Sequence, residues 1–375
     1  MDNPRIKLKR ICIKGFKSFG EAQEILFEDE TLLIGANGSG KSNLISFFSM
    51  LNHIRTGGFQ SYVEQQGGAN SILHYGAKKT KTIEYEIEFC AEYPSESRLT
   101  TYNVLINYGM PDRLLINGEK ISYQKTGMSE PLEYFLEPGF KESDLSKDNQ
   151  ASSRVVSYVL SNCRVFQFHD TSKEARFRQA CNINDNRYLK SDGGNLAAFL
   201  FAIKQNEPRY YTRIVNQIKA VFPLFGDFEL EPLRLNENMI MLNWYEKDSD
   251  YLFGPHQLSD GTLRFIALTT LLLQPAESRP SVIIIDEPEL GLHPSALESL
   301  SGMVHLASHS CQVFLATQSS TLLNDYDADN VLIIQRDQTL KQSIVKKLSS
   351  DDLHVWKDEY SLAELWDKNI LGGRP

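Results

Sequence analysis

The first half of the chain contains segments in which apolar and polar residues alternate with a period of two. Apolar residues occupy every second position of 83–89, with glutamates between them, and a similar alternation returns in 102–108. Successive side chains of a strand point to opposite faces, so this alternation predicts strands with one buried face. Asn117-Gly118, between the apolar segments 114–116 and 121–123, predicts a two-residue hairpin turn. Together these segments predict a β-meander.

Other segments are apolar at nearly every position, or carry apolar residues at helical spacing. Short continuous apolar runs are typical of strands that are buried on both faces. The predicted strands are 7–14, 23–27, 31–34, 164–169, 281–285, 312–316 and 330–335, with further strands within 227–245. The sequence is helical in character from about 171 to 222, including 195–204 and 210–222, and further helices begin near residues 43, 262 and 294. Residues 57–70 predict a connector and 140–155 a mobile polar loop.

This order of elements predicts an α/β core that is interrupted by a β-meander and by a mostly helical insertion. We expect three segments: an N-terminal lobe with the meander (1–140), a loop and helical insertion (141–230), and a C-terminal lobe (231–375). With 375 residues and 41% hydrophobic residues, the chain is large enough for a substantial core.

Charge and cysteine content narrow the classes of protein. The net charge of −9 does not suggest a general nucleic-acid binder, although a local basic patch remains compatible with it. The five cysteines are odd in number and form no C-x-x-C pair, which predicts reduced thiols in a cytoplasmic protein. No apolar run approaches the roughly 20 residues that cross a bilayer, so we expect no membrane association.

Residues 35–42, Gly-Ala-Asn-Gly-Ser-Gly-Lys-Ser, match the phosphate-binding loop G-x-x-x-x-G-K-[ST] in full. A short buried strand precedes this loop and a helix follows it, so backbone N–H groups and the helix dipole would face an anion. Lys41 is expected to reach the β- and γ-phosphates of ATP, and the Ser42 hydroxyl to bind Mg²⁺. The predicted nucleotide contacts in this loop are Gly35, Asn37, Gly38, Ser39, Gly40, Lys41, Ser42 and Asn43.

A second motif, Val282 to Glu287, is an apolar strand that ends in two acids. Such a Walker B strand would bring Asp286 to the Mg²⁺ ion and Glu287 to the attacking water, as general base. The strand 312–316 is followed by Gln318, at the position of a switch residue. A glutamine can donate to a γ-phosphate oxygen but carries no positive charge, so we expect slow turnover.

Residues 258–262, Leu-Ser-Asp-Gly-Thr, open a helix shortly before the Walker B strand. Taken alone, Ser259 and Gly261 are most simply a helix cap and a turn glycine. Their place before the Walker B strand also fits an ABC signature motif that binds nucleotide, with Asp260 replacing the first usual glycine. His293, in the following segment 288–294, is equally compatible with a γ-phosphate contact and with a helix cap.

At this level the chain resembles the SMC/RecF-type branch of ABC ATPases, and more narrowly the compact bacterial "AAA family ATPase" group often encoded in phage-defence operons. The segments that carry the resemblance are 15–19, 35–43, 168–172, 192–196, 258–264, 286–294, 316–319 and 371–375. They span nearly the whole chain. The resemblance implies an ABC-type P-loop ATPase head that binds ATP and Mg²⁺, with the meander and insertion as a lid.

The resemblance also implies a head-to-head homodimer, or a higher oligomer, that sandwiches two ATP molecules. Ser259 and Gly261 of one protomer would face the phosphate loop of the other. Lys17 falls where relatives place a basic residue near the phosphates. The glutamine that completes the Mg²⁺ site should follow the strand 164–169, and either His169 or Gln167 could take this role.

Two functional hypotheses follow from the resemblance. The first is a regulatory ATPase that senses a phage or nucleic-acid cue and controls a separately encoded effector protein, plausibly a nuclease. The second is a RecF-like DNA-binding ATPase of repair, for which Lys78, Lys79 and Lys81 could form part of a DNA-facing patch, although protection of a strand edge is the simpler interpretation of these lysines. The meander and insertion disfavour a transporter subunit, and the absence of an N-K-x-D motif disfavours a small GTPase.

Overall fold

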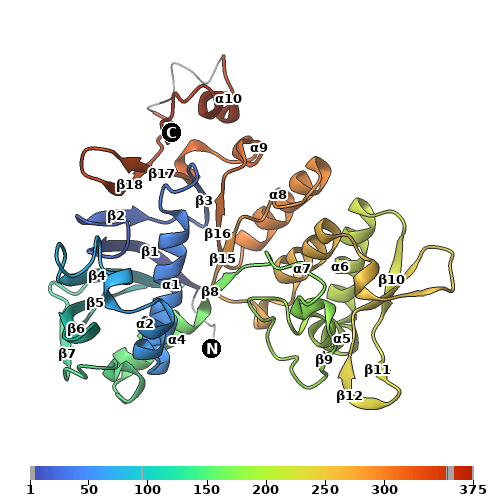
Figure 1. The fold of residues 1–375 in the computed structure, drawn as a ribbon, viewed down its shortest axis with the longest axis horizontal. Coiled ribbons are helices and arrows are strands. Elements are labelled where there is room, and N and C mark those ends of the chain that lie inside the picture. Colours follow the sequence, from blue (N-terminus) through green and yellow to red (C-terminus); the bar gives the residue numbers. More distant parts are fainter. Residues whose placement is uncertain (1–4, 94–95, 352, 354–358, 374–375) are drawn as a thin grey trace. The chain divides into compact units, whose positions relative to one another are not determined.

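The computed structural model describes residues 5–93, 96–351, 353 and 359–373 (Figure 1). The chain divides into two compact units. The first unit contains Met1–Val165, Ser281–Ile284 and Cys311–Pro375, and the second contains Phe166–Pro280 and Ile285–Ser310. The predicted segments 1–140, 141–230 and 231–375 do not coincide with these units, since 231–375 contributes to both. As a functional division, the three segments remain a prediction.

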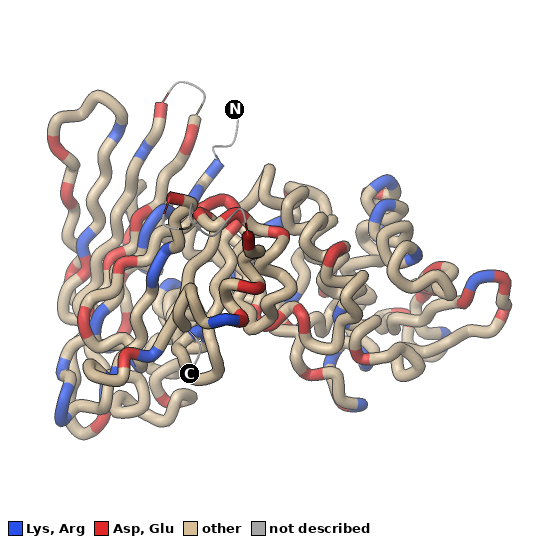
Figure 2. The backbone as a smooth tube through the Cα atoms, turned by 90° about the horizontal axis from the view of Figure 1, so that it is seen from above, with Lys and Arg blue, Asp and Glu red and all other residues tan. Residues whose placement is uncertain are grey.

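The predicted meander forms one face of the first unit, as a six-stranded antiparallel sheet that we call the meander sheet. Its strands, in spatial order, are β2 (Gln23–Leu26), β1 (Arg5–Lys14), β4 (Thr82–Glu92), β5 (Ser97–Gly109), β6 (Arg113–Lys125) and β7 (Leu132–Leu136). The alternation in 83–89 is confirmed, because its apolar residues are at most 3% exposed. Figure 2 shows acidic and basic positions interspersed along the backbone of this unit. On the meander sheet, Arg10 of β1 forms an ion pair with Glu86 of β4.

The hairpin predicted at Asn117-Gly118 is wrong. Strand β6 continues through these residues, with Ile116 opposite Ile106 and Gly118 opposite Leu105, so Asn117 is the extra residue of a β-bulge. The reason is the odd spacing of Ile116 and Ile121, which are both buried. Only an inserted residue can keep both side chains on the same face of a strand with period two. The turn lies at residues 110–112 instead.

A second six-stranded sheet, the mixed sheet, holds the strands that precede the predicted motifs. Its order is β18 (Gln342–Lys347), β17 (Val331–Asp337), β3 (Glu30–Ile34), β16 (Gln312–Thr317), β15 (Val282–Asp286) and β8 (Cys163–Phe166). Strand β3 lies parallel to β16 on one side and to β17 on the other. The predicted strands at 31–34, 281–285, 312–316 and 330–335 are therefore confirmed within one or two residues.

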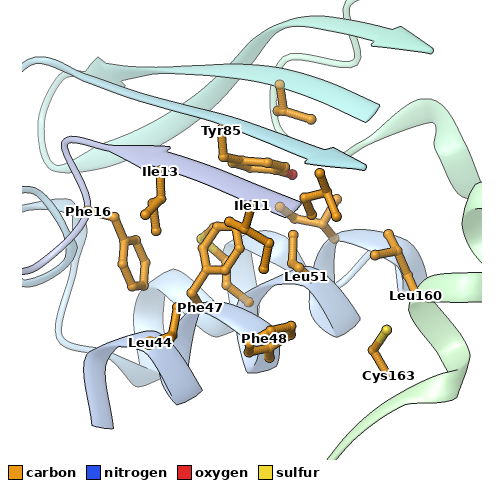
Figure 3. Close-up of a cluster of buried hydrophobic side chains, with 14 of the residues drawn as sticks. Ile11, Ile13, Phe16, Leu44, Phe47, Phe48, Leu51, Tyr85, Leu160 and Cys163 are labelled. Carbon is orange, nitrogen blue, oxygen red and sulfur yellow. The ribbon is translucent and has the colours of Figure 1, made fainter. Parts of the chain in front are cut away.

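Helix α1 (Lys41–Thr56) begins at the last two residues of the phosphate loop and packs against the inner face of the meander sheet. Its buried residues include Leu44, Phe47 and Phe48, and Figure 3 shows Phe47 pointing toward Ile11 and Tyr85 of the sheet. Phe47 packs edge-to-face on Tyr85 with ring centroids 5.2 Å apart. This aromatic contact is one of those that hold α1 against the meander sheet.

The second unit is built from four helices and two small sheets. The helices are α5 (Leu196–Asn206), α6 (Pro208–Val221), α7 (Asp260–Leu273) and α8 (Pro294–Ser308). The sheets are β10 (Phe225–Glu229), β13 (Asn243–Glu246) and β14 (Leu252–Phe253), and β11 (Pro232–Leu233), β12 (Asn236–Ile240) and β9 (Cys181–Asn182). Helix α7 is buried along nearly its whole length after the first turn, because its sequence is apolar on every side.

Some predicted loops and helices differ from the structure. The connector 57–70 contains α2 (Phe59–Gln65) and α3 (Ala69–Ile72), and the loop 140–155 ends where α4 (Ala151–Asn162) begins. Strand β8 ends at Phe166, three residues earlier than predicted, and residues 171–195 are largely irregular. Among the described residues, no helix is both long and apolar enough to cross a bilayer.

Candidate nucleotide-binding elements

The phosphate loop joins β3 to α1, and its glycines are required by close contacts. Gly38 and Gly40 have φ values of +77° and +117°, which favour glycine. A Cβ atom on Gly40 would lie 2.2 Å from Ser343 Oγ, and one on Gly35 would lie 2.3 Å from the Ile334 carbonyl oxygen. Close contacts therefore require glycine at positions 35 and 40, and the positive φ favours glycine at position 38.

The polar groups of the loop suit a phosphate ligand. The Lys41 ammonium group, only 5% exposed, donates to the carbonyl oxygens of Gly35 and Ala36 at 2.5 and 3.2 Å. The Ser39 hydroxyl is buried and has no hydrogen-bond partner among the described residues. A buried hydroxyl without a partner is costly, so this atom fits a bound polar ligand. Ser42 is exposed at the first turn of α1, where it would hold Mg²⁺.

The carbonyl oxygen of Gly373 accepts a hydrogen bond from the Ala36 backbone N–H at 3.1 Å, so the tail of the chain contacts the phosphate loop. The sequence prediction missed this contact. Gly373 has a φ of +90°, and a Cβ atom on it would lie 2.8 Å from the Trp366 ring. Trp366 is buried in α10 (Leu362–Asp367).

Lys17 lies at the edge of a pocket of about 740 Å³ in the first unit that also includes Asn43, Tyr75 and Arg336. Its ammonium group donates to Ser46 Oγ at 2.6 Å and to Gln66 Oε1 at 2.8 Å. Partial burial lowers the pKa of Lys17 below its usual value. The backbone at Lys17 has a φ of +45°, a strained conformation that is concentrated at functional sites.

In the second unit, Asp286 ends strand β15 and is 6% exposed. Gln167 Nε2 donates to its carboxylate oxygen Oδ2 at 3.0 Å, whereas His169 Nε2 lies 3.0 Å from its main-chain oxygen. Of the two residues that the sequence left open, only Gln167 contacts the carboxylate that would bind the metal. Glu287 follows with a φ of +45°, again strained for a residue other than glycine.

The residues around Asp286 do not form a metal centre on their own. The described part of the chain holds no group of three or more His, Cys, Asp or Glu side chains placed to share a metal ion. Mg²⁺ at phosphate sites is held by one or two side chains, with the rest of its shell from phosphate and water. The few oxygen ligands predicted here therefore fit Mg²⁺ bound together with a nucleotide.

The segment 258–264, which we call the signature segment, opens α7 with a helix cap. Ser259 Oγ accepts from the Thr262 backbone N–H at 3.1 Å, as the simpler interpretation predicts, and the side chain of Ser259 stays exposed. A Cβ atom on Gly261 would lie 2.1 Å from the Gly291 carbonyl oxygen, so the close approach of residue 291 requires this glycine. The binding of a partner's nucleotide by Ser259 and Gly261 remains a prediction.

His293 and Gln318 occupy the ends of elements, as expected. His293 caps α8 through its Nδ1 atom, which accepts from the Ser295 backbone N–H at 3.4 Å, as the capping interpretation expects. Its contact with a γ-phosphate remains a prediction. Gln318 directly follows β16 in the first unit and is half-buried. The sequence did not single out two arginines that contact this region. Arg178 donates to Asp260 of the signature segment, and Arg264, which belongs to the segment, donates to the Phe168 carbonyl oxygen. Only their long-range contacts reveal them.

The comparisons with known proteins agree with the motifs. Residues 166–324 match the family model described as "AAA domain, putative AbiEii toxin, Type IV TA system". The Old nuclease of Escherichia phage P2 is 34% identical over 242 residues, which cover 57% of this chain and 38% of that protein. The energy-coupling factor transporter ATP-binding protein EcfA2 of Staphylococcus saprophyticus is 28% identical over 104 residues, or 27% of this chain and 34% of that protein. The chain thus matches little more than a third of either relative's length.

Two solved structures share the fold over nearly the whole chain. One is an SMC head bound to the C-terminal winged-helix domain of ScpA, with a TM-score of 0.57. The other is a Pyrococcus furiosus SMC head with an extended coiled coil, bound to the C-terminal domain of ScpA, with a TM-score of 0.55. Both are 15% identical in sequence to this chain. The matches cover 93% and 94% of this chain, respectively, and 99% of each solved chain. The chain is therefore similar to SMC/RecF-like ABC ATPases and has the fold of an ABC-type P-loop ATPase head.

Proposed function

We propose that this protein binds and hydrolyses Mg-ATP in a dimer that closes when ATP is bound and reopens after hydrolysis. The observation that carries this proposal is the phosphate loop, whose glycine geometry and buried Ser39 hydroxyl fit a phosphate. In it, Lys41 and Ser42 bind the phosphates and Mg²⁺, Asp286 orients the metal, and Glu287 activates water.

Closure in this mechanism follows from contacts that exist only in the dimer. Ser259 and the Gly261 backbone of one protomer contact the γ-phosphate of the other, so ATP binds the closed state more tightly and shifts the equilibrium toward it. Gln318 supplies a neutral donor near the γ-phosphate, which stabilises negative charge less than a cation would, so turnover is slow.

We further propose that this ATPase regulates a separately encoded effector, a nuclease, in defence against phage. Two similarities support this proposal. The description of the family model that matches 166–324 names a putative toxin, and a phage nuclease matches 57% of the chain. The cytoplasmic location expected from the cysteine pattern belongs to the same proposal.

Light scattering with and without Mg-ATP tests the mechanism, with wild type compared with Glu287→Gln. The variant keeps ATP binding but lacks the base, so its mass rises on ATP addition and stays high, while wild type returns to its starting mass. Glu298→Gln, which alters an exposed acid on α8, is the matched control and behaves as wild type. If the mass of all three proteins is unchanged by ATP, this result contradicts ATP-driven closure of the isolated chain.

The alternative function, a DNA-binding ATPase of repair, is favoured by one surface. Lys78, Lys79 and Lys81 are exposed, and no salt bridge joins them to an acid within the described residues. DNA binding that weakens steeply with salt, and that is lost when all three become glutamate, would support this function. If wild type and the triple glutamate variant bind DNA equally weakly, the regulatory function is the better explanation.

A further inference from the structure

Arg178 is the most deeply buried cation beside the signature segment. It is 4% exposed, and its guanidinium group donates to the carbonyl oxygens of Pro255 at 2.6 Å, Leu258 at 3.2 Å and Thr171 at 3.1 Å. A fourth bond, of 2.7 Å, joins it to Asp260 Oδ1. A buried arginine that donates to three main-chain carbonyls holds the segments that carry them together.

Arg264, at the end of the signature segment, makes a second set of such bonds. It donates to the carbonyl oxygens of Phe168, His169 and Leu290, each at 2.8 Å. A longer contact of 3.5 Å reaches Thr171 Oγ1, so both arginines meet the segment 168–171. Breaking these bonds would leave main-chain carbonyls and a guanidinium group partly buried without partners, which is costly.

The segment that both arginines hold also reaches the predicted metal ligand. Gln167, directly before it, donates to the Asp286 carboxylate, and His169 contacts the Asp286 main chain. Hydrogen bonds therefore link Leu258 and Asp260, the neighbours of Ser259, through Arg178 to the segment 168–171, and this segment in turn to Asp286. All of these residues belong to the second unit.

This arrangement explains an unusual residue in the signature segment. Asp260 stands where the usual ABC signature has glycine, yet its side chain is 61% exposed and fills no core position. Its interaction is the ion pair with the buried Arg178 guanidinium. A glycine would leave that guanidinium one acceptor short.

We propose that Arg178 and Arg264 are positioning residues that hold the signature segment and the Gln167–Asp286 contact as one rigid element. Binding of Ser259 to the nucleotide of a second protomer then occurs on the element that also orients Asp286, so dimer closure and metal orientation are coupled within each chain. This inference rests on the proposed function, because the coupling acts only when ATP joins two protomers.

Asp260→Asn tests the proposal with little risk to folding, because the Asp260 side chain is largely exposed. The asparagine oxygen still accepts from Arg178 but carries no charge, and this charge contributes up to about tenfold to an equilibrium, so we expect kcat and the ATP-dependent dimer affinity to fall by roughly threefold to tenfold. The ATP affinity of the monomer should stay within about twofold of wild type. The melting temperature should stay within about 2 °C of wild type. Asp260→Glu, which restores the carboxylate, should recover most of the loss.

Arg178→Lys and its double variant with Asp260→Asn measure the coupling between the two residues. If the ion pair acts through Arg178, the double variant loses little more than the worse single variant. Arg176→Ala is the matched control: it removes an exposed arginine two residues away, paired with Asp192, and leaves all readouts unchanged.

The outcomes separate the inference from the proposed function. Wild-type kcat and dimer affinity in both Asp260→Asn and Arg178→Lys overturn the positioning role alone. Loss of monomer ATP binding in step with the melting temperature shows a merely structural role and also overturns it. A wild-type protein that neither binds ATP nor dimerises with it overturns the proposed function, and the inference falls with it.

Discussion

The phosphate loop and the signature segment are two predicted nucleotide-binding elements that the chain builds in different ways. The phosphate loop is a backbone structure: glycines at 35, 38 and 40 allow its path, and neighbouring backbone and hydroxyl atoms pack against it. The signature segment is held by side chains, chiefly two arginines. Arg178 lies far from the segment in sequence and donates to its Leu258 carbonyl oxygen, whereas Arg264 belongs to the segment and donates to the distant Leu290 carbonyl oxygen. Local sequence is therefore sufficient to recognise the first, while the second depends on contacts between residues far apart in the chain.

The largest effect is expected from the phosphate loop. Lys41→Ala removes the ammonium group that is expected to bind two phosphate groups. Two charge-assisted hydrogen bonds contribute roughly 3 kcal/mol, so ATP affinity should fall about 100-fold in isothermal titration calorimetry. Lys14→Ala, which removes an exposed lysine of β1, is the control and should bind ATP normally. An affinity within threefold of wild type in Lys41→Ala would mean that the loop does not bind ATP as proposed.

A smaller effect on activity is expected from the residues beside Asp286, where substitutions can distinguish the roles of Gln167 and His169. Gln167→Ala removes the donor to the Asp286 carboxylate, and losing such an outer partner typically costs 10- to 100-fold in metal affinity. The Mg²⁺ concentration for half-maximal ATP hydrolysis should therefore rise about tenfold or more. His169→Ala should raise it less, because His169 contacts only the main chain of Asp286. The opposite order would assign the role to His169.

Two glycines of the second unit show whether close packing shapes the signature segment. Gly261→Ala places a methyl group 2.1 Å from the Gly291 carbonyl oxygen, which should cost about 1–3 kcal/mol of unfolding free energy in urea titrations. Gly302→Ala, inside α8, meets nothing within 4 Å and should instead stabilise the protein by about 0.5–1 kcal/mol. Equal effects of the two substitutions would contradict the close contact.

The smallest effect should come from one titrating group in the meander sheet. Burial raises the pKa of Glu119, although the hydroxyls of Ser143 and Tyr102 partly offset this. Because the folded state holds this proton more tightly than the unfolded state, stability should fall as the pH rises from about 4.5 through the folded pKa. In Glu119→Gln the pH dependence of urea unfolding should be shallower over that range. An unchanged slope would mean that another group dominates.

Much of the fold was predictable because it is encoded in short patterns. The alternation at 83–89, the buried strands and the phosphate loop follow from period, hydrophobicity and glycine spacing within ten or so residues. The wrong hairpin at Asn117-Gly118 had a strong local signal, yet pairing of β6 with β5 along its whole length outweighed it. The helices within 57–70 were missed because their sequence is polar and rich in glycine.

By itself, the sequence determined the phosphate loop, the acidic end of β15 and the α/β core, since each depends on neighbouring residues. Only the tertiary structure decided that Gln167 rather than His169 contacts the Asp286 carboxylate, that Gly373 bonds to the phosphate loop, and that Arg178 and Arg264 hold the signature segment. These contacts join residues that are far apart in the chain. Their partners are set by how strands and helices pack, which no local spacing records.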